Sequence, residues 1–384
     1  MNPVKTTRLL ALAVIILIYG TMNFYIGKRL WGLTSSVLSP EYRTLFWSLF
    51  WLVAFSYFAG RAAGGYLPSR LASFLTVTGS YWLAAMFYLF LLLGAGDTIY
   101  VVGSYAGILS STQAKANLAS STAVLLTLAI IGYGVWNAHN PRVTHYRVVI
   151  TKKAPIDQLR IVMVSDVHLG TIVGPKRLSL LVTEVNRLQP DLLLLPGDIL
   201  DDHPGSWSEN ELVESLTKLK ARYGKYAVPG NHEYLGGRIE KNIALLERSG
   251  IRVLRDACVL VGNSFYLAGR DEKMARIISG KARLPLAQLL AGIDRTRPVI
   301  LMDHQPVDLD EALREGVDLQ LSGHTHVGQM FPNRFVTRRV YEIDWGYLQK
   351  ENLQVVVSSG FGTWGPPIRV GNYPEIVAID LGFA

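Results

Sequence analysis

The first part of the chain alternates long apolar runs with short polar segments. Four of the runs are long enough to cross a bilayer, which takes about 20 residues, and they cover roughly residues 9–26, 44–60, 73–95 and 119–138. The first run leads into Lys28 and Arg29 without a small-residue cleavage pattern, so it is not a removable signal. The pattern predicts an N-terminal α-helical membrane bundle of about four spans.

Residues 98–111 form a fifth, shorter apolar stretch, which we expect to be re-entrant or interfacial rather than a further span. With four spans, both ends of the chain lie on one side of the membrane. The flanks on that side carry eight Lys and Arg residues, whereas the opposite loops carry four. The positive-inside rule therefore predicts that both ends, and the domain that follows the spans, are cytoplasmic.

From about Val143 the pattern becomes that of a soluble α/β domain, so we divide the chain into residues 1–142 and 143–384. Amphipathic helices are expected at 175–188, after a capping box made by Ser208 and Glu211, and from about Arg238 to Gly250. Between them lie short β-rich apolar runs, at 161–164, 192–195, 226–228, 299–302, 319–321 and 355–357. This alternation predicts helices packed on sheet.

Charge and cysteine content narrow the classes of function. Residues 1–150 hold ten of the 38 basic and two of the 30 acidic residues, which leaves 28 of each for the remainder. The net charge of +8 thus belongs to the apolar region, where it is scattered and forms no basic stripe, so we expect no nucleic-acid partner. Cys258 is the single cysteine, which excludes an intrachain disulfide and paired-cysteine metal sites.

Five short blocks of the sequence together hold five of the eight histidines and three aspartates. The blocks are Asp166-Val167-His168, Gly197-Asp198, Gly230-Asn231-His232-Glu233, Asp303-His304 and Gly323-His324-Thr325-His326. Each block follows a predicted strand, so five loops from one edge of a sheet are expected to converge. Any one block is an ordinary turn sequence. Five in this order, each at a strand end, predict a two-metal hydrolytic centre.

The residue types in these blocks limit the ions that could bind. Carboxylate, amide oxygen and imidazole without sulfur suit divalent Mn, Fe, Zn or similar ions, among which we favour Mn. The glycines beside Asp198, Asn231 and His324 are expected to let the backbone approach an ion closely. Asp303 and Glu233 are either residues that orient the neighbouring histidines or solvent-facing charges.

The ordered blocks resemble the calcineurin-like metallophosphoesterase family over roughly residues 156–380. The preceding spans and the tail segment 362–369 resemble a membrane-attached branch of that family, found mostly in bacteria. The resemblance implies a two-sheet β-sandwich flanked by helices. It implies that Asp166, His168 and His326 hold one metal ion, that Asn231, His304 and His324 hold the other, that Asp198 bridges both, and that His232 is the acid. Val327 stands where the branch often has glycine.

The function expected from this resemblance is hydrolysis of a phosphate ester or pyrophosphate by a metal-bridged hydroxide, at a bacterial inner membrane. Because the spans keep the domain near lipid headgroups, a lipid-linked phosphate is one candidate substrate. The alternatives are a soluble cyclic-nucleotide phosphodiesterase and a non-catalytic, metal-stabilised membrane scaffold. Arg334, Arg338 and Arg339 could contact a substrate phosphate or form a solvated loop.

Overall fold

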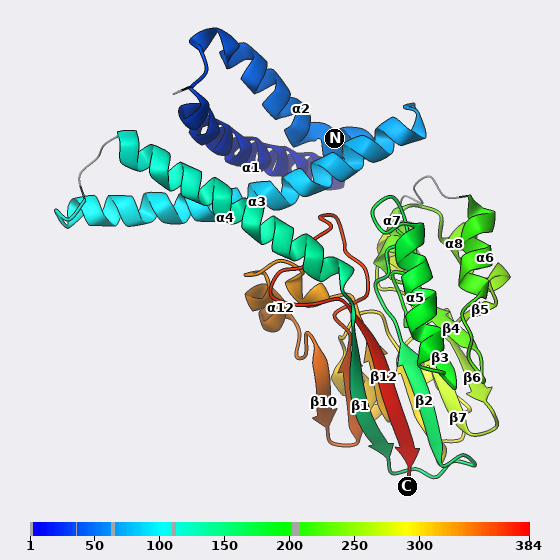
Figure 1. The fold of residues 1–384 in the computed structure, drawn as a ribbon. Helices are drawn as coiled ribbons and strands as arrows, with labels where there is room; N and C mark the ends of the chain where they lie inside the picture. The colour runs from blue at the N-terminus through cyan, green and yellow to red at the C-terminus, as the bar shows by residue number, and fades with distance from the viewer. Residues whose placement is uncertain (1–2, 36, 63–65, 110–112, 202–207) are drawn as a thin grey trace. The chain divides into compact units, whose positions relative to one another are not determined.

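The computed structural model describes residues 3–35, 37–62, 66–109, 113–201 and 208–384. The chain divides into two compact units, Met1–Gly134 and Val135–Ala384 (Figure 1).

The first unit is built from four long apolar helices. They are α1 (Pro3–Thr34), α2 (Arg43–Ala62), α3 (Ser69–Tyr105) and α4 (Gln113–His139), with a short 3₁₀ turn, η1 (Pro40–Tyr42), before α2. The last five residues of α4, from Val135 on, belong to the second unit. All four are long and apolar enough to cross a membrane, which confirms the predicted spans. Polar groups inside this unit pair with one another: Asp97 accepts from the Tyr25 hydroxyl and forms an ion pair with Arg29.

The expectation of a separate re-entrant segment at residues 98–111 is wrong for its first part. Residues 98–105 continue α3, which runs without a break for 37 residues. The sequence there contains no proline, and Gly94 and Gly96 are tolerated in a helix with apolar surroundings. Residues 110–112 lie outside the described part of the chain.

The second unit is a sandwich of two mixed six-stranded sheets. The first sheet has the order β1 (Arg142–Ile150), β12 (Glu375–Phe383), β2 (Gln158–Met163), β3 (Leu192–Pro196), β4 (Lys225–Val228), β5 (Ile251–Val253). The second has the order β10 (Gly346–Lys350), β11 (Leu353–Val357), β9 (Leu319–Ser322), β8 (Val299–Met302), β7 (Phe265–Gly269), β6 (Ala257–Val261). This architecture confirms the expected fold class.

Helices cover the outer faces of the sandwich and connect its strands. They are α5 (Pro175–Arg187), α6 (Glu209–Thr217), α7 (Asn231–Leu235), α8 (Ile239–Arg248), α9 (Ala275–Ser279), α10 (Leu286–Leu289), α11 (Leu309–Arg314), the 3₁₀ turn η2 (His326–Gly328) and α12 (Arg334–Val340). The helices predicted at 175–188 and 238–250 are confirmed as α5 and α8. The capping box of Ser208 and Glu211 is present at the start of α6.

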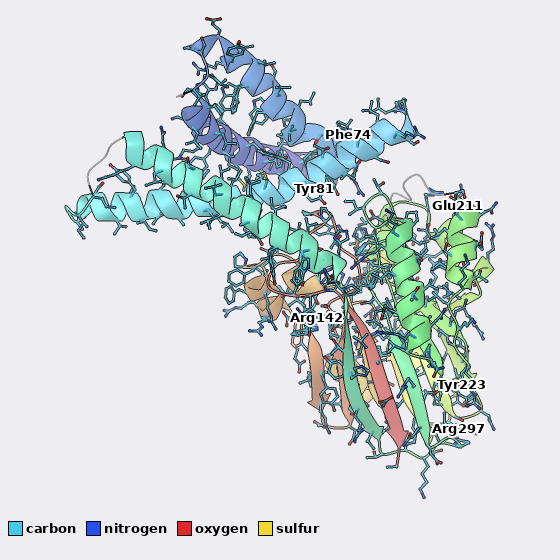
Figure 2. All side chains as sticks on the ribbon, viewed as in Figure 1. Phe74, Tyr81, Arg142, Glu211, Tyr223 and Arg297 are labelled. Carbon is cyan, nitrogen blue, oxygen red and sulfur yellow. The ribbon has the colours of Figure 1, made fainter. Side chains whose placement is uncertain are left out.

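Successive side chains of a strand point to opposite faces of the sheet, so they pack in two different hydrophobic cores. One core lies between the two sheets, and the other lies between a sheet and the helices that cover it. On β2, Ile161 and Met163 point between the sheets, where they pack with Ile300 of the second sheet. Val162 points to the other side and packs with Leu178 of α5. Arg142 lies toward one end of the sandwich, and Tyr223 and Arg297 lie toward the other (Figure 2). The strands are therefore fixed on both faces, and so are the loops at their ends.

Candidate metal centre

The five sequence blocks lie on loops at strand ends, as expected, but the strands belong to two sheets. Asp166 and His168 follow β2, Asp198 follows β3, and Asn231 and His232 begin α7 after β4, all in the first sheet. His304 follows β8, and His324 and His326 follow β9, in the second sheet. The expectation of a single sheet edge is therefore wrong. The sandwich instead brings two loop sets together at one end.

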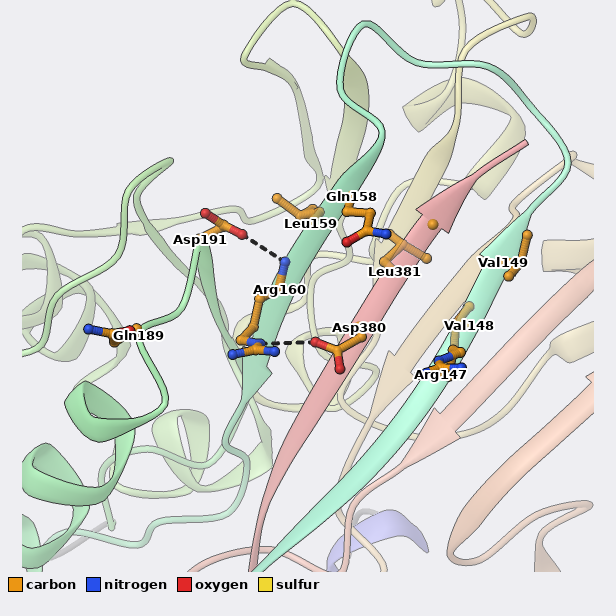
Figure 3. A pocket seen from close by; sticks show the side chains of 11 residues that line it. Arg147, Val148, Val149, Gln158, Leu159, Arg160, Gln189, Asp191, Asp380 and Leu381 are labelled. Atoms are coloured by element: carbon orange, nitrogen blue, oxygen red, sulfur yellow. Dashed lines mark hydrogen bonds and ion pairs between the residues drawn. The ribbon is translucent and has the colours of Figure 1, made fainter.

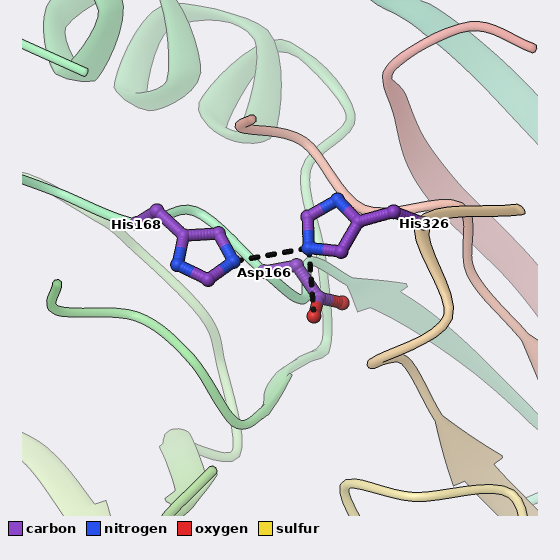
Figure 4. A group of neighbouring side chains, drawn as sticks. All are labelled: Asp166, His168 and His326. Carbon is purple, nitrogen blue, oxygen red and sulfur yellow. Dashed lines mark hydrogen bonds and ion pairs between the residues drawn. The ribbon is translucent and has the colours of Figure 1, made fainter. Parts of the chain in front are cut away.

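The first group of donor atoms joins Asp166, His168 and His326 (Figure 4). The Nε2 atoms of His168 and His326 lie 3.0 Å apart. His326 Nε2 also lies 3.5 Å from Asp166 Oδ1. All three side chains are buried, so two imidazole nitrogens and a carboxylate face one small volume.

The second group joins Asn231, His304 and His324. The Asn231 amide oxygen lies 3.2 Å from His304 Nε2 and 2.9 Å from His324 Nδ1. The His304 ring is held from behind, because its Nδ1 donates to the Pro196 carbonyl at 2.9 Å. This contact leaves His304 Nε2 to face the other donors.

Asp198 lies between the two groups. Its Oδ2 is 3.8 Å from His168 Nε2 and 3.3 Å from His304 Nε2. Donor atoms of Asp198, His304 and His324 lie within 4.8 Å of one another, and so do those of His168, Asp198 and His232. The structure thus brings together all eight residues that the sequence singled out.

The backbone at this centre is strained. Asp166, His168, Asp198, His324 and His326 all have φ between 46° and 72°. A non-glycine residue in such a region costs on the order of 1–3 kcal/mol and persists only where the surrounding structure enforces it. Val327 also has a positive φ of 53°, where a glycine would not be strained. Strain concentrated on the donor residues is typical of a functional site.

Two glycines permit the donors to pack this closely. A Cβ atom at Gly230 would collide with the Asp198 carboxylate, and one at Gly323 would collide with the Asp166 carboxylate. The absence of a side chain at these glycines therefore leaves space for the neighbouring carboxylates. The expected role of the glycines was to let the backbone approach an ion, and the structure shows this additional one.

Burial sets the protonation states of the centre. It lowers the pKa of His168 to about 3 and that of His324 to about 4, so both rings are neutral, which is the form that binds metal ions. Burial also disfavours ionised Asp198, but its contacts with His304 hold the pKa of Asp198 well below its usual range. The ionised Asp198 carboxylate in turn raises the pKa of His304 well above its usual range. Carboxylates, imidazoles and an amide oxygen form a donor set that fits divalent cations.

Glu233 and Asp303 are both buried, so the solvent-facing alternative is wrong for each. The Glu233 carboxylate accepts hydrogen bonds from the backbone N–H groups of four residues: Asp198, Ile199, Leu200 and Gly230. The Asp303 carboxylate instead pairs with Arg283 at 3.0 Å and with Arg270 at 3.7 Å. Glu233 therefore fixes the loop that carries Asp198, and two arginines neutralise Asp303 beside His304.

Two supporting residues make contacts that the sequence did not reveal. Asp201 Oδ1 lies 2.9 Å from Nδ1 of His232 and orients that ring. Arg369 is fully buried; its Nη2 lies 3.1 Å from Nδ1 of His326, and its guanidinium donates to the carbonyls of Ser359, Gly360 and Gly362. The segment 360–365, which matches a dinucleotide-binding pattern, is thus a loop built around Arg369.

Asn137, in the last turn of α4, holds the same loop from its other side. Its side-chain amide donates to the carbonyls of Arg369, at 3.0 Å, and Asn372, at 2.6 Å. The end of the fourth apolar helix is therefore hydrogen-bonded to the residue that contacts His326.

A cavity of about 590 Å³ lies elsewhere in the second unit (Figure 3). It is lined at the amino end of β2 by Gln158 and Arg160, and Arg160 forms an ion pair with Asp380 at 2.9 Å. Asp166 follows the opposite end of the same strand, so this cavity is separate from the donor residues.

Two mixed sheets that bring histidine and aspartate donors together at their loop ends are the fold of a metal-dependent phosphoesterase. The family of calcineurin-like phosphoesterases matches residues 159–328. A protein of Campylobacter jejuni named an uncharacterized metallophosphoesterase is 30% identical over 96% of this chain and 97% of its own length. The chain therefore belongs to the calcineurin-like metallophosphoesterase family, whose members bind a dinuclear centre of divalent metal ions.

Other relatives differ in length. An uncharacterized metallophosphoesterase of Aquifex aeolicus is 32% identical over 62% of this chain and 91% of its own length. A protein of Danio rerio named transmembrane protein with metallophosphoesterase domain is 32% identical over 67% of this chain, which spans 62% of that relative. Among solved structures, a protein of Thermus thermophilus aligns over 53% of this chain and 90% of its own, with 14% identity and a TM-score of 0.34.

Proposed function

We propose that the chain is a membrane-anchored phosphoesterase that uses two divalent ions to hydrolyse a phosphate ester or pyrophosphate bond. The observation that carries this proposal is the convergence of seven donors, five of them buried, in two groups of three with Asp198 between them. Asp166, His168 and His326 would hold one ion, Asn231, His304 and His324 the other, and Asp198 both. Mn is the favoured metal.

When bound, such an ion pair lowers the pKa of a water molecule and neutralises charge that develops on the phosphoryl oxygens. The protein's own residues orient these groups. The backbone N–H of Asp198 donates to the Glu233 carboxylate, and Nδ1 of the His304 ring donates to the Pro196 carbonyl. Preorganised donors of this kind need no rearrangement during the reaction, which is a large part of their catalytic value.

His232 is the residue that we assign as general acid. Its ring packs edge-on against His168 with centroids 4.5 Å apart, and Asp201 holds its Nδ1, so its Nε2 is the atom that would give a proton to the leaving oxygen. Removing a general acid typically costs 10²- to 10⁴-fold in rate. The loss in His232→Ala should grow as the leaving alcohol becomes more basic. An equal loss for nitrophenyl and alkyl esters would contradict this role.

We further propose that the substrate is a phosphate or pyrophosphate linked to a lipid. The four apolar helices keep the catalytic unit at a membrane, and Trp364, an exposed aromatic side chain, lies 6.3 Å from the His232 ring.

The positive-inside balance of the loops favours a cytoplasmic catalytic unit, beginning near residue 143, at a bacterial inner membrane. A reporter that requires export, fused after Ala384, should be inactive in this arrangement.

The decisive assay is hydrolysis of a nitrophenyl phosphodiester with Mn²⁺ by the full chain, compared with Asp198→Asn and His326→Ala. We expect turnover by the native protein and a large loss in both variants. Unchanged turnover in the variants would refute the assigned site. No turnover by any of the three proteins would favour the non-catalytic scaffold. A following screen in detergent that finds hydrolysis of nucleotides and of no lipid phosphate would replace the lipid-linked substrate by a nucleotide.

A further inference from the structure

One short helix beside the metal centre exposes a cluster of large apolar side chains. Phe331, Phe335, Val336 and Val340, which we call the α12 face, are between 51% and 66% exposed. The rings of Phe331 and Phe335 pack against each other with centroids 5.7 Å apart, and Val336 and Val340 are one helical turn apart. Single exposed apolar residues are normal on protein surfaces, whereas a contiguous group indicates an interaction site.

The same helix is basic. Arg338 and Arg339 are exposed, and α12 contains no acidic residue. Within the described part of the chain, neither arginine has a carboxylate at salt-bridge distance. Of the two acids that follow the helix, Glu342 pairs with Lys350 at 3.0 Å and Asp344 accepts from Thr337 at 2.7 Å. Apolar side chains beside unpaired arginines match the surface of a bilayer with anionic lipids.

A chain of ring contacts joins α12 to the point where the polypeptide leaves its fourth apolar helix. The Arg334 guanidinium lies 5.4 Å from the Trp345 ring, and Trp345 packs on Tyr373 at 5.5 Å. Tyr373 in turn lies 4.4 Å from the Arg142 guanidinium, and Arg142, labelled in Figure 2, begins β1 just after His139 ends α4. Arg334, at the start of α12, is therefore linked by packed side chains to Arg142, at the start of β1.

The other end of α12 reaches the metal centre. Tyr341, which ends the helix, packs its ring against His324 with centroids 6.1 Å apart. Before the helix, the Phe331 N–H donates to the carbonyl of Val370 at 2.8 Å, next to Arg369. Any surface that receives the α12 face thus also lies beside the donor residues.

We propose that the α12 face inserts into the interfacial region of a bilayer that contains anionic lipids, and so holds the metal centre at the level of the lipid headgroups. Phe331, Phe335, Val336 and Val340 enter the boundary between headgroups and acyl chains, and Arg338 and Arg339 contact lipid phosphates. This docking does not depend on which phosphate ester the enzyme hydrolyses, and its test below does not require turnover.

The experiment uses the full chain in nanodiscs of phosphatidylcholine and phosphatidylglycerol, with Cys258→Ser to remove the single cysteine. An environment-sensitive fluorophore is attached at Phe335→Cys, and quenching by a nitroxide in the upper acyl region of the lipids is measured. The matched control is Val149→Cys, because Val149 is also exposed. Val149 lies on β1 seven residues beyond Arg142, which places it about 23 Å from Arg142 at a rise of about 3.3 Å per residue.

An interfacial helix buries its apolar face roughly 5–10 Å into the boundary, so we expect about twofold quenching or more at position 335 and none at 149. The change Arg338→Gln with Arg339→Gln should reduce the quenching at 335. Equal quenching at 335 and 149 would overturn the proposal. The fluorescence at position 335 could instead change with the number of chains per disc and not with the quencher. That result would show that the α12 face binds a second copy of the chain, and it would also overturn the proposal. Quenching that is unchanged by the arginine substitutions would refute the contact with anionic lipid.

Discussion

The clearest test of how the fold supports the metal centre is the substitution Glu233→Gln. Oε1 of Glu233 accepts from the N–H groups of Ile199 and Leu200, at 2.7 and 2.9 Å, and Oε2 accepts from those of Asp198 and Gly230, at 3.0 and 2.7 Å. Glutamine has nearly the same shape but replaces one of these acceptors by an NH₂ donor. Two buried backbone N–H groups then face a donor and lose their partner.

The magnitude follows from those two bonds. A hydrogen bond to a charged group contributes about 1.5–3 kcal/mol, so the variant should lose about 3–6 kcal/mol of unfolding free energy. In a domain of this size that loss lowers the melting temperature by roughly 6–24 °C. Burial raises the pKa of Glu233 to about 7, against the effect of the N–H donors, so the measurement is made at pH 8, where most of the carboxylate is ionised.

The assay is thermal unfolding of the full chain in detergent, with Glu247→Gln as control, because Glu247 is exposed on α8. Mn²⁺ affinity is measured on the same samples, and we expect it to fall roughly 10- to 100-fold, as for other residues that orient metal ligands. A melting temperature for Glu233→Gln equal to that of the control would refute the assigned role of the carboxylate.

Three further substitutions test the residues around the centre. Asp201→Asn should lower kcat with little change in KM, because the His232 ring remains but loses its orientation. The loss should be smaller than the roughly 10²- to 10⁴-fold expected for removal of His232. A change in KM alone would contradict this role of Asp201. Arg369→Lys should weaken Mn²⁺ binding roughly 10- to 100-fold, since a lysine cannot reach His326 and the three loop carbonyls together; native affinity in a metal titration would oppose it. Asn137→Ala should destabilise the catalytic unit by about 1–3 kcal/mol, because two carbonyls lose their donor, whereas Asn140→Ala, at an exposed position, should not; thermal unfolding distinguishes the two.

The eight candidate site residues could be found from the sequence because each lies directly after a strand with a short apolar run. Strand ends place side chains by local geometry alone, so Asp166 or His324 can be recognised without knowledge of distant contacts. The grouping into two sheets could not be found in this way. It depends on pairings such as Ile161 with Ile379 and Leu301 with Gln320, which join distant parts of the chain.

The contacts of the supporting residues were missed for a related reason, although Glu233 itself was a candidate for orienting a neighbouring histidine. Arg369 contacts His326, 43 positions away; it ends the tail segment 362–369 that resembles the family branch, but the sequence does not reveal that contact. Glu233 has an ordinary helix-start position, and only the fold shows that its carboxylate collects N–H groups from the Asp198 loop. The strand β1 was missed because it is the edge of its sheet and alternates exposed with half-buried residues over most of its length.

We propose that one chain holds two divalent ions through Asp198 and the two donor groups. The metal content of the purified full chain tests this proposal and is measured by mass spectrometry after equilibration with Mn²⁺ and removal of free metal. We expect two ions per chain for the native protein and for Asp191→Ala, which changes an acid at the far end of the domain, and fewer in Asp198→Ala. A native protein with no more than one ion, or an Asp198→Ala variant that still holds two, would contradict it.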